Sequence, residues 1–281
     1  MVKSVTSIIS PDEERILEPY FAGCEASEIA MRQVERISTE TSICLRKVEW
    51  LAIKKGVAPQ RYLRNLGTFY YAGQLKLFES TVVLVGLGGL GGQLLEQLGR
   101  VGIGEIIAAD PDVFEETNLN RQLLSNEANF GKEKINEAKE RLEKINKAVE
   151  FTGFQSHLDE LPDEVWEKTD LVFDCLDNID DRLVLAQKCS TSNCPLVHGA
   201  IAGWYGEVGV VWPGSKMLEK HYQGQNEGLE KELGTPPFTA AVAANLMGAK
   251  GCQILMGKHQ SRQSTIHFFD LLENDWENIQ M

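Results

Sequence analysis

The stretch VVLVGLGGLGG, residues 82–92, decides the fold. Four apolar residues with high strand propensity run directly into a turn in which five of seven residues are glycine. Gly86, Gly88 and Gly91 match the pattern G-x-G-x-x-G, and Gly89 lies in the same turn. Such a turn between a strand and a helix lets backbone N–H groups approach a phosphate, and the helix N-terminus favours negative charge. The stretch therefore predicts a nucleotide-binding strand–turn–helix unit.

Strand-like and helix-like segments alternate on either side of this turn. Short apolar runs are followed by segments whose apolar residues recur every three to four positions. The strand candidates are 81–86, 105–110, 149–154, 171–177, 195–200 and 207–212, and the helix candidates are 93–101, 132–148, 180–191 and 238–257. This alternation predicts an α/β protein with a doubly wound, mainly parallel, Rossmann-like sheet, which binds its ligand where the strands end.

The first 60 residues have a different pattern. Residues 27–37 and 42–55 are candidates for short amphipathic helices. The second could belong to a helix-turn-helix, but a helical appendage on one edge of the main domain agrees better with the acidic charge. We therefore predict an N-terminal helical extension over 1–60 and a Rossmann-like domain over 61–281.

Charge and composition exclude several classes of protein. The 281 residues carry a formal net charge of −13, whereas a nucleic-acid partner requires a basic surface. No apolar run reaches the roughly 20 residues of a membrane helix, and the N-terminus lacks the apolar core of a signal peptide. We therefore predict a cytoplasmic protein without nucleic-acid or membrane partners. None of the six cysteines forms a C-x-x-C pair, which argues against zinc and for reduced thiols.

Polar residues after the glycine turn narrow the choice of nucleotide. Asp110 ends the next strand, where an acid accepts hydrogen bonds from ribose hydroxyls. Asn118 and Arg121 are three apart and so point the same way on a helical turn, and an arginine fork suits phosphate oxygens. A capping asparagine beside a surface arginine is the alternative. The glycine turn and its acid alone do not separate NAD from ATP.

Lys134 and Asp177 indicate a polyphosphate with a metal ion. In its predicted helix, Lys134 is the basic residue nearest to the apolar stripe, so it can reach over the sheet edge. Asp177 follows an apolar strand, where a carboxylate can hold Mg²⁺ directly or through water. The alternative is that Asp177 caps the next helix, a task that Asn178 or Asp180 can perform. Together these residues look like a site for ATP and Mg²⁺.

The order of these motifs resembles a known family. GLGGLGG, Asp110, NLNRQ, Lys134 and DCLDN follow one another as in the adenylating enzymes of the ThiF/MoeB/HesA group, relatives of ubiquitin-activating enzymes. The match covers roughly residues 61–257, which makes the second domain an adenylation domain. RYLRN (61–65) resembles the family's RYxRQ segment, in which the second arginine, here Arg64, reaches the ATP of the partner subunit in a homodimer.

The resemblance also implies a reaction. In the family, the C-terminal carboxylate of a small ubiquitin-like sulfur-carrier protein, usually ending in Gly-Gly, attacks the α-phosphorus of ATP and expels pyrophosphate. The carboxylate is ionised at neutral pH, so the site needs no general base and has to align the reactants and neutralise charge. The implied roles are ribose binding by Asp110, phosphate binding by Asn118, Arg121 and Lys134, charge neutralisation by Arg64, and Mg²⁺ binding by Asp177.

The chain departs from the family pattern in its second half. Many relatives carry two C-x-x-C pairs for zinc and a cysteine that takes up the activated carboxylate, whereas residues 213–241 here contain no cysteine. Thr235 occupies a comparable place, but a turn or helix N-cap role suits it better. We predict adenylation without zinc and without a thioester on this chain, with the product passing to a separate sulfur donor. Cys189 and Cys194 are expected to be structural.

Two further features concern the entry of a carrier's tail. Residues 215–234 are polar and rich in Gly and Glu, which is typical of a mobile loop where the tail could enter. His198 and Trp204 lie in a segment of small and aromatic residues that would suit a narrow channel for the tail. Packing in the core near the sheet is the favoured alternative for both side chains.

Three other functions compete with carrier adenylation. A tRNA threonylcarbamoyladenosine dehydratase-like enzyme adenylates a carboxylate on tRNA, but it needs a basic face. An NAD-dependent oxidoreductase shares the glycine turn, and binding of ATP with Mg²⁺ but not NADH would exclude it. An inactive binding module is disfavoured because Arg64, Arg121, Lys134 and Asp177 are all present.

Overall fold

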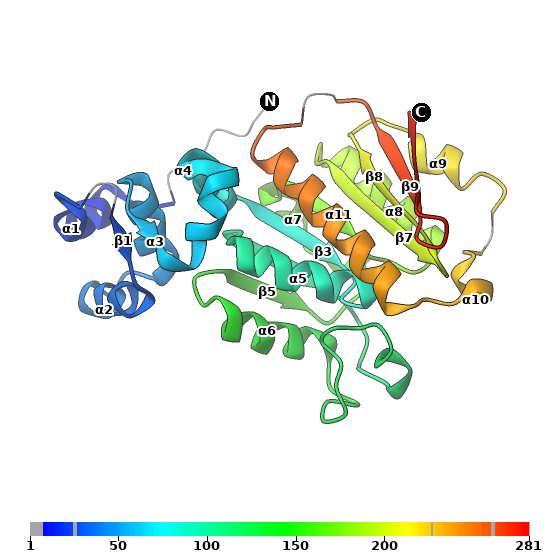
Figure 1. Ribbon diagram of the computed structural model, residues 1–281, viewed down its shortest axis with the longest axis horizontal. Coiled ribbons are helices and arrows are strands. Elements are labelled where there is room, and N and C mark those ends of the chain that lie inside the picture. Colours follow the sequence, from blue (N-terminus) through cyan, green and yellow to red (C-terminus); the bar gives the residue numbers. More distant parts are fainter. Residues whose placement is uncertain (1–7, 25–26, 226, 260–261, 281) are drawn as a thin grey trace.

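A central eight-stranded sheet forms the main body of the protein (Figure 1). The computed structural model describes residues 8–24, 27–225, 227–259 and 262–280. The strand order is β10–β9–β8–β7–β6–β3–β4–β5. The strands are β3 (Thr81–Val85), β4 (Glu105–Ala109), β5 (Glu150–Phe154), β6 (Leu171–Asp174), β7 (Leu196–Ala202), β8 (Tyr205–Val211), β9 (Thr265–Asp270) and β10 (Asp275–Gln280).

The first five of these strands in chain order are parallel, and the last three add an antiparallel edge. The prediction of an α/β protein with a mainly parallel, doubly wound sheet is therefore confirmed. The chain runs from β3 outward to β4 and β5 and then returns to place β6 on the other side of β3. This reversal opens a crevice at the carboxyl ends of β3 and β6, where sheets of this type bind ligands.

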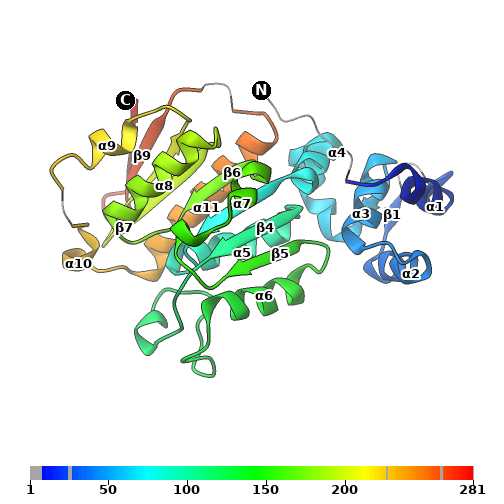
Figure 2. The same cartoon turned by 180° about the vertical axis from the view of Figure 1, so that it is seen from behind.

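Helices cover both faces of the sheet (Figures 1 and 2). One face carries α5 (Gly89–Val101), α6 (Lys134–Ile145) and α11 (Pro237–Leu255), and the other carries α7 (Asp163–Lys168), α8 (Ile179–Thr191) and α9 (Met217–His221). All five residues of β3 are buried, because they contact apolar side chains of both layers. The glycine turn is thereby fixed at the end of a strand that solvent does not reach.

The N-terminal residues form a separate helical unit beside the sheet. It contains α1 (Pro11–Phe21), α2 (Met31–Thr41) and α3 (Leu45–Lys54), with a two-stranded pair of β1 (Glu28–Ile29) and β2 (Ala58–Pro59). The predicted helix 27–37 starts too early, because residues 28 and 29 pair with β2 before the helix begins. A turn, η1 (Gln60–Tyr62), and α4 (Leu63–Glu79) lead to β3, and α4 changes direction at Tyr70, whose φ is +57°.

A buried polar cluster joins this unit to the main body. The Tyr62 hydroxyl donates to Glu49 Oε2 at 3.2 Å and accepts from Asn146 Nδ2 at 2.7 Å, and Arg61 contacts both Glu49 and Asn146. Burial raises the pKa of Glu49 to about 7, against the opposing charge of Arg61. The apolar core of the N-terminal unit includes Tyr62 and Phe78, so it extends past residue 60, and the predicted boundary there stays a prediction.

Two short helices interrupt the segment that was expected to be a loop. Within residues 215–234 lie α9 and α10 (Glu230–Leu233). Met217 and Leu218 anchor α9, because they are buried in the same apolar cluster as residues of α7 and α8. The remaining short helical turns are η2 (Glu116–Asn118) and η3 (Leu158–Glu160). Within the described ranges, no helix is both long enough and apolar enough to cross a bilayer.

Candidate active site

The glycine turn combines close packing with an open face. A side chain at Gly91 would place its Cβ 1.9 Å from the Gly86 carbonyl oxygen, and Gly86 itself has φ +95° and lies against the backbone of Cys175. Only glycine avoids a clash at these two positions. Gly86, Gly88 and Gly89 line a cavity at the carboxyl ends of the strands. Gly91 is not among the described residues that line it, so this glycine serves the packing of helix on strand rather than direct contact with a ligand.

Replacing Gly91 by alanine is expected to destabilise the protein by about 3 kcal/mol and to weaken ATP binding, because the turn has to move away from the added methyl group. Denaturant unfolding and calorimetric titration with ATP measure the two effects. The matched control is Gly67→Ala in α4, where no atom lies within 4 Å of the added Cβ and helix propensity favours alanine. Unchanged stability and ATP affinity in Gly91→Ala would contradict the packing role.

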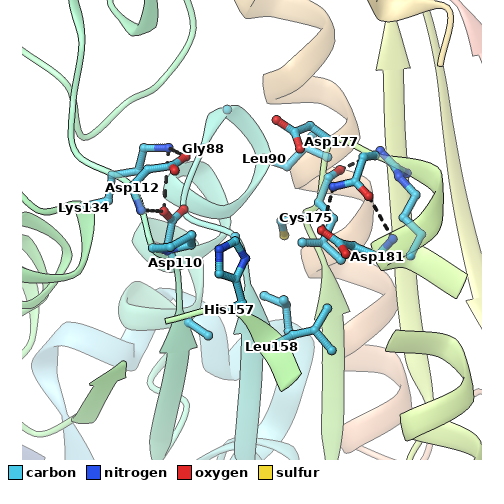
Figure 3. Close-up of a pocket in the computed structure, with 18 of the residues that line it drawn as sticks. Gly88, Leu90, Asp110, Asp112, Lys134, His157, Leu158, Cys175, Asp177 and Asp181 are labelled. Carbon is cyan, nitrogen blue, oxygen red and sulfur yellow. Dashed lines mark hydrogen bonds and ion pairs between the residues drawn. The ribbon is translucent and has the colours of Figure 1, made fainter. Parts of the chain in front are cut away.

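The main cavity has a volume of about 940 Å³ and opens along the crevice between β3 and β6. Figure 3 shows Asp110, Asp112 and Lys134 on one side of it and Asp177 and Asp181 on the other. Its size lies in the range of small-molecule and nucleotide sites. The cavity therefore collects acidic and basic side chains from six separate segments of the chain.

Asp110 holds the glycine turn in place. Its carboxylate accepts hydrogen bonds from the backbone N–H groups of Leu87, at 2.6 Å, and Asp112, at 2.9 Å. Burial raises the pKa of Asp110, although the nearby Lys134 and the two N–H groups oppose that rise. Asp110 also lines the cavity, and its two backbone hydrogen bonds fix the turn there.

Lys134 and Asp112 face the same side of the cavity. Lys134 is only 5% exposed, as its position near the apolar stripe predicted, and its Nζ lies 2.8 Å from Asp112 Oδ2 and 3.8 Å from Asp110 Oδ1. The side chain of Asp112 is 63% exposed and lines the cavity. The sequence analysis missed Asp112, although the paired acids of Asp110-Pro-Asp112 were visible as a signal.

The structure brings Arg121 to the cavity and does not bring Asn118 there. Arg121 lines the cavity, and its Nη1 donates to Thr117 O at 3.1 Å and Asn120 Oδ1 at 2.8 Å. Asn118 Oδ1 accepts from the N–H of Glu115 at 3.0 Å and thereby caps the turn η2. The capping alternative thus describes Asn118, which is absent from the described lining of the cavity.

Gln122 is a second cavity residue that the sequence analysis missed. It lies beside Gly88, is 6% exposed, and lines the cavity. Its side-chain oxygen is buried and accepts no hydrogen bond from any described residue. A buried oxygen without a donor is costly, so this atom is suited to accept a hydrogen bond from a bound ligand.

Asp177 does not cap α8, the helix that follows it. Asn178 caps α8, because its Oδ1 accepts from the N–H of Asp181 at 2.9 Å. Asp177 is exposed and lines the cavity. Over the residues that the structure describes, no three His, Cys, Asp or Glu side chains form a metal-binding group. One carboxylate still fits Mg²⁺, which keeps several waters and binds substrate phosphates in addition to one or two acids.

Arg64 and Thr235 differ in whether they line the cavity. Arg64 is an exposed residue of α4 and is outside the described lining of this chain's cavity. Thr235 does line the cavity, and its carbonyl oxygen accepts from Asn120 at 3.0 Å. The expected N-cap role for Thr235 is wrong, because Pro236 occupies the N-cap of α11.

The two residues considered for the tail channel, His198 and Trp204, differ in burial. His198 is fully buried, and its Nδ1 lies 2.6 Å from Asp174 Oδ2, so burial near the sheet is confirmed for this residue. Core packing is the wrong expectation for Trp204, which is 44% exposed and stacks on Phe238. All six cysteines are free, and Cys189 and Cys194 are buried, which agrees with their expected structural role.

A buried charged cluster lies beside the cavity under α9. Burial alone would lower the pKa of His198, but hydrogen bonds to Asp174 and Glu207 raise it on balance. Arg182 is buried next to them and donates to the carbonyl oxygens of Leu176 and Gly199. The basic side chains of Arg182, His198 and His221 lie around the two acids and offset the cost of burying them.

Comparisons with known proteins identify the family of this chain. The profile of the ThiF family matches residues 62–281. The SAMP-activating enzyme E1 of Haloferax volcanii is 30% identical over 217 residues, covering 74% of this chain and 78% of that protein. The molybdopterin-synthase adenylyltransferase of Escherichia coli K12 is 30% identical over 230 residues, covering 79% and 92%.

A solved structure supports the fold. The crystal structure of Escherichia coli MccB superposes with a TM-score of 0.66 at 22% identity, over 79% of this chain and 69% of that chain. The family profile spans well over half of the chain, and the glycine turn lies within it. The chain therefore belongs to the ThiF family and is an adenylyltransferase that uses ATP.

Proposed function

We propose that this protein adenylates the C-terminal carboxylate of a small ubiquitin-like sulfur-carrier protein that ends in Gly-Gly. The observation that carries the proposal is the convergence of the glycine turn, Arg121, Lys134 and Asp177 on one cavity. One relative, the sulfur carrier protein ThiS adenylyltransferase of Escherichia coli, is named for action on such a carrier, and another is named as an adenylyltransferase of molybdopterin synthase.

The triphosphate lies across the glycine turn and the two cations. The N-terminus of α5 and the N–H groups of the turn face the cavity, where they favour phosphate oxygens. Lys134 and Arg121 neutralise the charge that builds on pyrophosphate as the carboxylate forms its bond to the α-phosphorus. Asp177 is the residue that would hold Mg²⁺, and the ion would supply further charge neutralisation.

The geometry suggests a change in the role of the two acids after β4. Asp112 is exposed to the cavity, so it accepts hydrogen bonds from the ribose hydroxyls. Asp110 contributes indirectly by fixing Leu87 and holding Lys134. Asn118 also acts indirectly, because it shapes the turn that presents Arg121.

The remaining parts of the proposed reaction involve a second copy of this chain and a separate sulfur donor. In a homodimer, Arg64 on the exposed side of α4 reaches the ATP of the partner subunit. The acyl-adenylate, a mixed anhydride of the carrier and AMP, then passes to a separate sulfur donor rather than to a cysteine of this chain. The absence of any cysteine from 213–241 supports this last step.

The test is ATP–pyrophosphate exchange with small ubiquitin-like carriers from the same genome. Exchange is expected with a carrier that has its intact Gly-Gly end and not with the same carrier shortened by two residues. Exchange that depends on tRNA instead would favour the dehydratase alternative. Binding of NADH without binding of ATP and Mg²⁺ would refute adenylation altogether.

A further inference from the structure

A second, smaller cavity adjoins the main cavity beneath α9 and α10. This side cavity has a volume of about 230 Å³ and shares Asp177, Arg182, Ile201 and Glu230 with the main cavity. The shared residues include the acid assigned to Mg²⁺, so the two cavities meet close to the triphosphate. A substrate whose carboxylate reaches the α-phosphorus through this junction would leave its preceding residues in the side cavity.

The walls of the side cavity are mainly apolar. They come from α8, β7, β8, α9, β9 and the start of α10, and their apolar members include Ile179, Ala200, Ile201, Ala202, Tyr205, Leu229 and Phe268. The two alanines leave room where larger residues would fill the space. An apolar cavity with few polar groups binds an apolar group of its own size.

The buried polar side chains at one end of the side cavity are hydrogen-bonded to one another. Glu207 accepts from Tyr222 at 2.8 Å and contacts His198 at 3.1 Å and His221 at 2.9 Å. None of these side chains is among the buried polar atoms without a partner in the described residues. The other charged residues that line it, Asp177, Arg182 and Glu230, lie at the end shared with the main cavity. A charged side chain that enters beyond them would lose its water among mainly apolar walls.

The mouth of the side cavity is apolar as well. Leu229 is 65% exposed and Tyr205 is 49% exposed, although both line the cavity. Exposed apolar residues that continue into a cavity mark a path along which an apolar group enters.

We propose that the side cavity binds the side chain of the residue that precedes the terminal Gly-Gly of the substrate, and that this residue is apolar. An extended chain advances about 3.3 Å per residue, so two glycines span roughly 7 Å from the activated carboxylate. The third residue from the end then lies in the side cavity. This inference rests on the proposed adenylation of a carboxyl terminus and adds the chemistry of the tail that is selected.

The experiment uses the full chain and synthetic hexapeptides Ser-Ser-Ser-X-Gly-Gly with a free carboxyl terminus, where X is Leu, Phe, Gly, Asp or Lys. The readout is kcat/KM for peptide-dependent ATP–pyrophosphate exchange. The Leu peptide is expected to exceed the Gly, Asp and Lys peptides by about 10- to 100-fold, because a buried leucine side chain gains that much affinity.

Ala200→Leu tests the cavity itself. Ala200 lines the side cavity and not the main cavity, so the added side chain fills the proposed pocket while the Kd for ATP stays within about twofold. The preference for Leu over Gly is expected to disappear. The matched control is Ala22→Leu, at an exposed position of the N-terminal unit, which keeps the preference.

The outcomes separate the inference from the function on which it rests. Exchange that is equally fast for all five peptides, or a Leu preference that survives Ala200→Leu, overturns the side-cavity inference and leaves carboxyl-terminal adenylation standing. A preference for Asp or Lys overturns the apolar character of the pocket. A chain that binds ATP but catalyses no exchange with any peptide or carrier refutes the proposed function, and the inference falls with it.

Discussion

Replacing Lys134 by alanine is expected to slow ATP–pyrophosphate exchange by about 10²- to 10³-fold while the chain stays folded. The buried ammonium group is fixed by Asp112 and faces the cavity beside the glycine turn. Its charge opposes the negative charge that develops on the leaving pyrophosphate, so its loss raises the barrier more than it weakens ATP binding. Exchange kinetics at saturating ATP measure the effect, and thermal unfolding checks the fold.

The control for Lys134→Ala is Lys139→Ala in the same helix. Lys139 is exposed and lies outside the described lining of the cavity, so its loss changes net charge by the same amount without touching the site. Exchange is expected to stay within about twofold in this control. Unchanged exchange in Lys134→Ala would discredit the assignment of the triphosphate to this side of the cavity.

Asp177→Asn is expected to reduce exchange by about 10²-fold and to raise the Mg²⁺ concentration needed for half-maximal rate. The amide keeps the shape of the side chain but removes the negative charge that attracts a hard cation. Because Asn178 performs the capping of α8, the helix itself should not be weakened. A Mg²⁺ titration of the exchange rate separates loss of metal binding from a general loss of activity.

Asp180→Asn provides the matched comparison for Asp177→Asn. Asp180 lies three residues further along, is exposed, and is not part of the described cavity lining. Its variant should show the Mg²⁺ dependence of the unmodified protein. If both variants shift the titration equally, the effect comes from surface charge in general, and Asp177 is not the metal ligand.

The sheet and the glycine turn were predictable because they depend on local pattern. Apolar runs alternating with helical periods fix a doubly wound sheet, and the period of α6 alone identified Lys134 as the lysine nearest to the core. These features follow from one segment at a time. The antiparallel edge and the exact extent of α2 were less accessible, because pairing with distant strands decides them.

The roles of the acids and of Asn118 required the folded chain. Which of Asp110 and Asp112 faces a ligand depends on which carboxylate the backbone of the glycine turn engages, 23 residues away in sequence. Asn118 was open to two interpretations until its oxygen was seen to accept from Glu115. The side cavity was also hidden, because its walls come from strands and helices that are distant in sequence.

The position of Tyr62 ties the N-terminal helices to the segment that carries Arg64. The family match starts at this residue, yet its ring packs edge-on against Phe78 and its hydroxyl lies between Glu49 of α3 and Asn146 after α6. The first turn of α4, which carries Arg64, begins at the very next residue. The N-terminal unit therefore fixes the start of α4. Loosening its contacts with Tyr62 would shift the first turn of this helix and with it the position of Arg64.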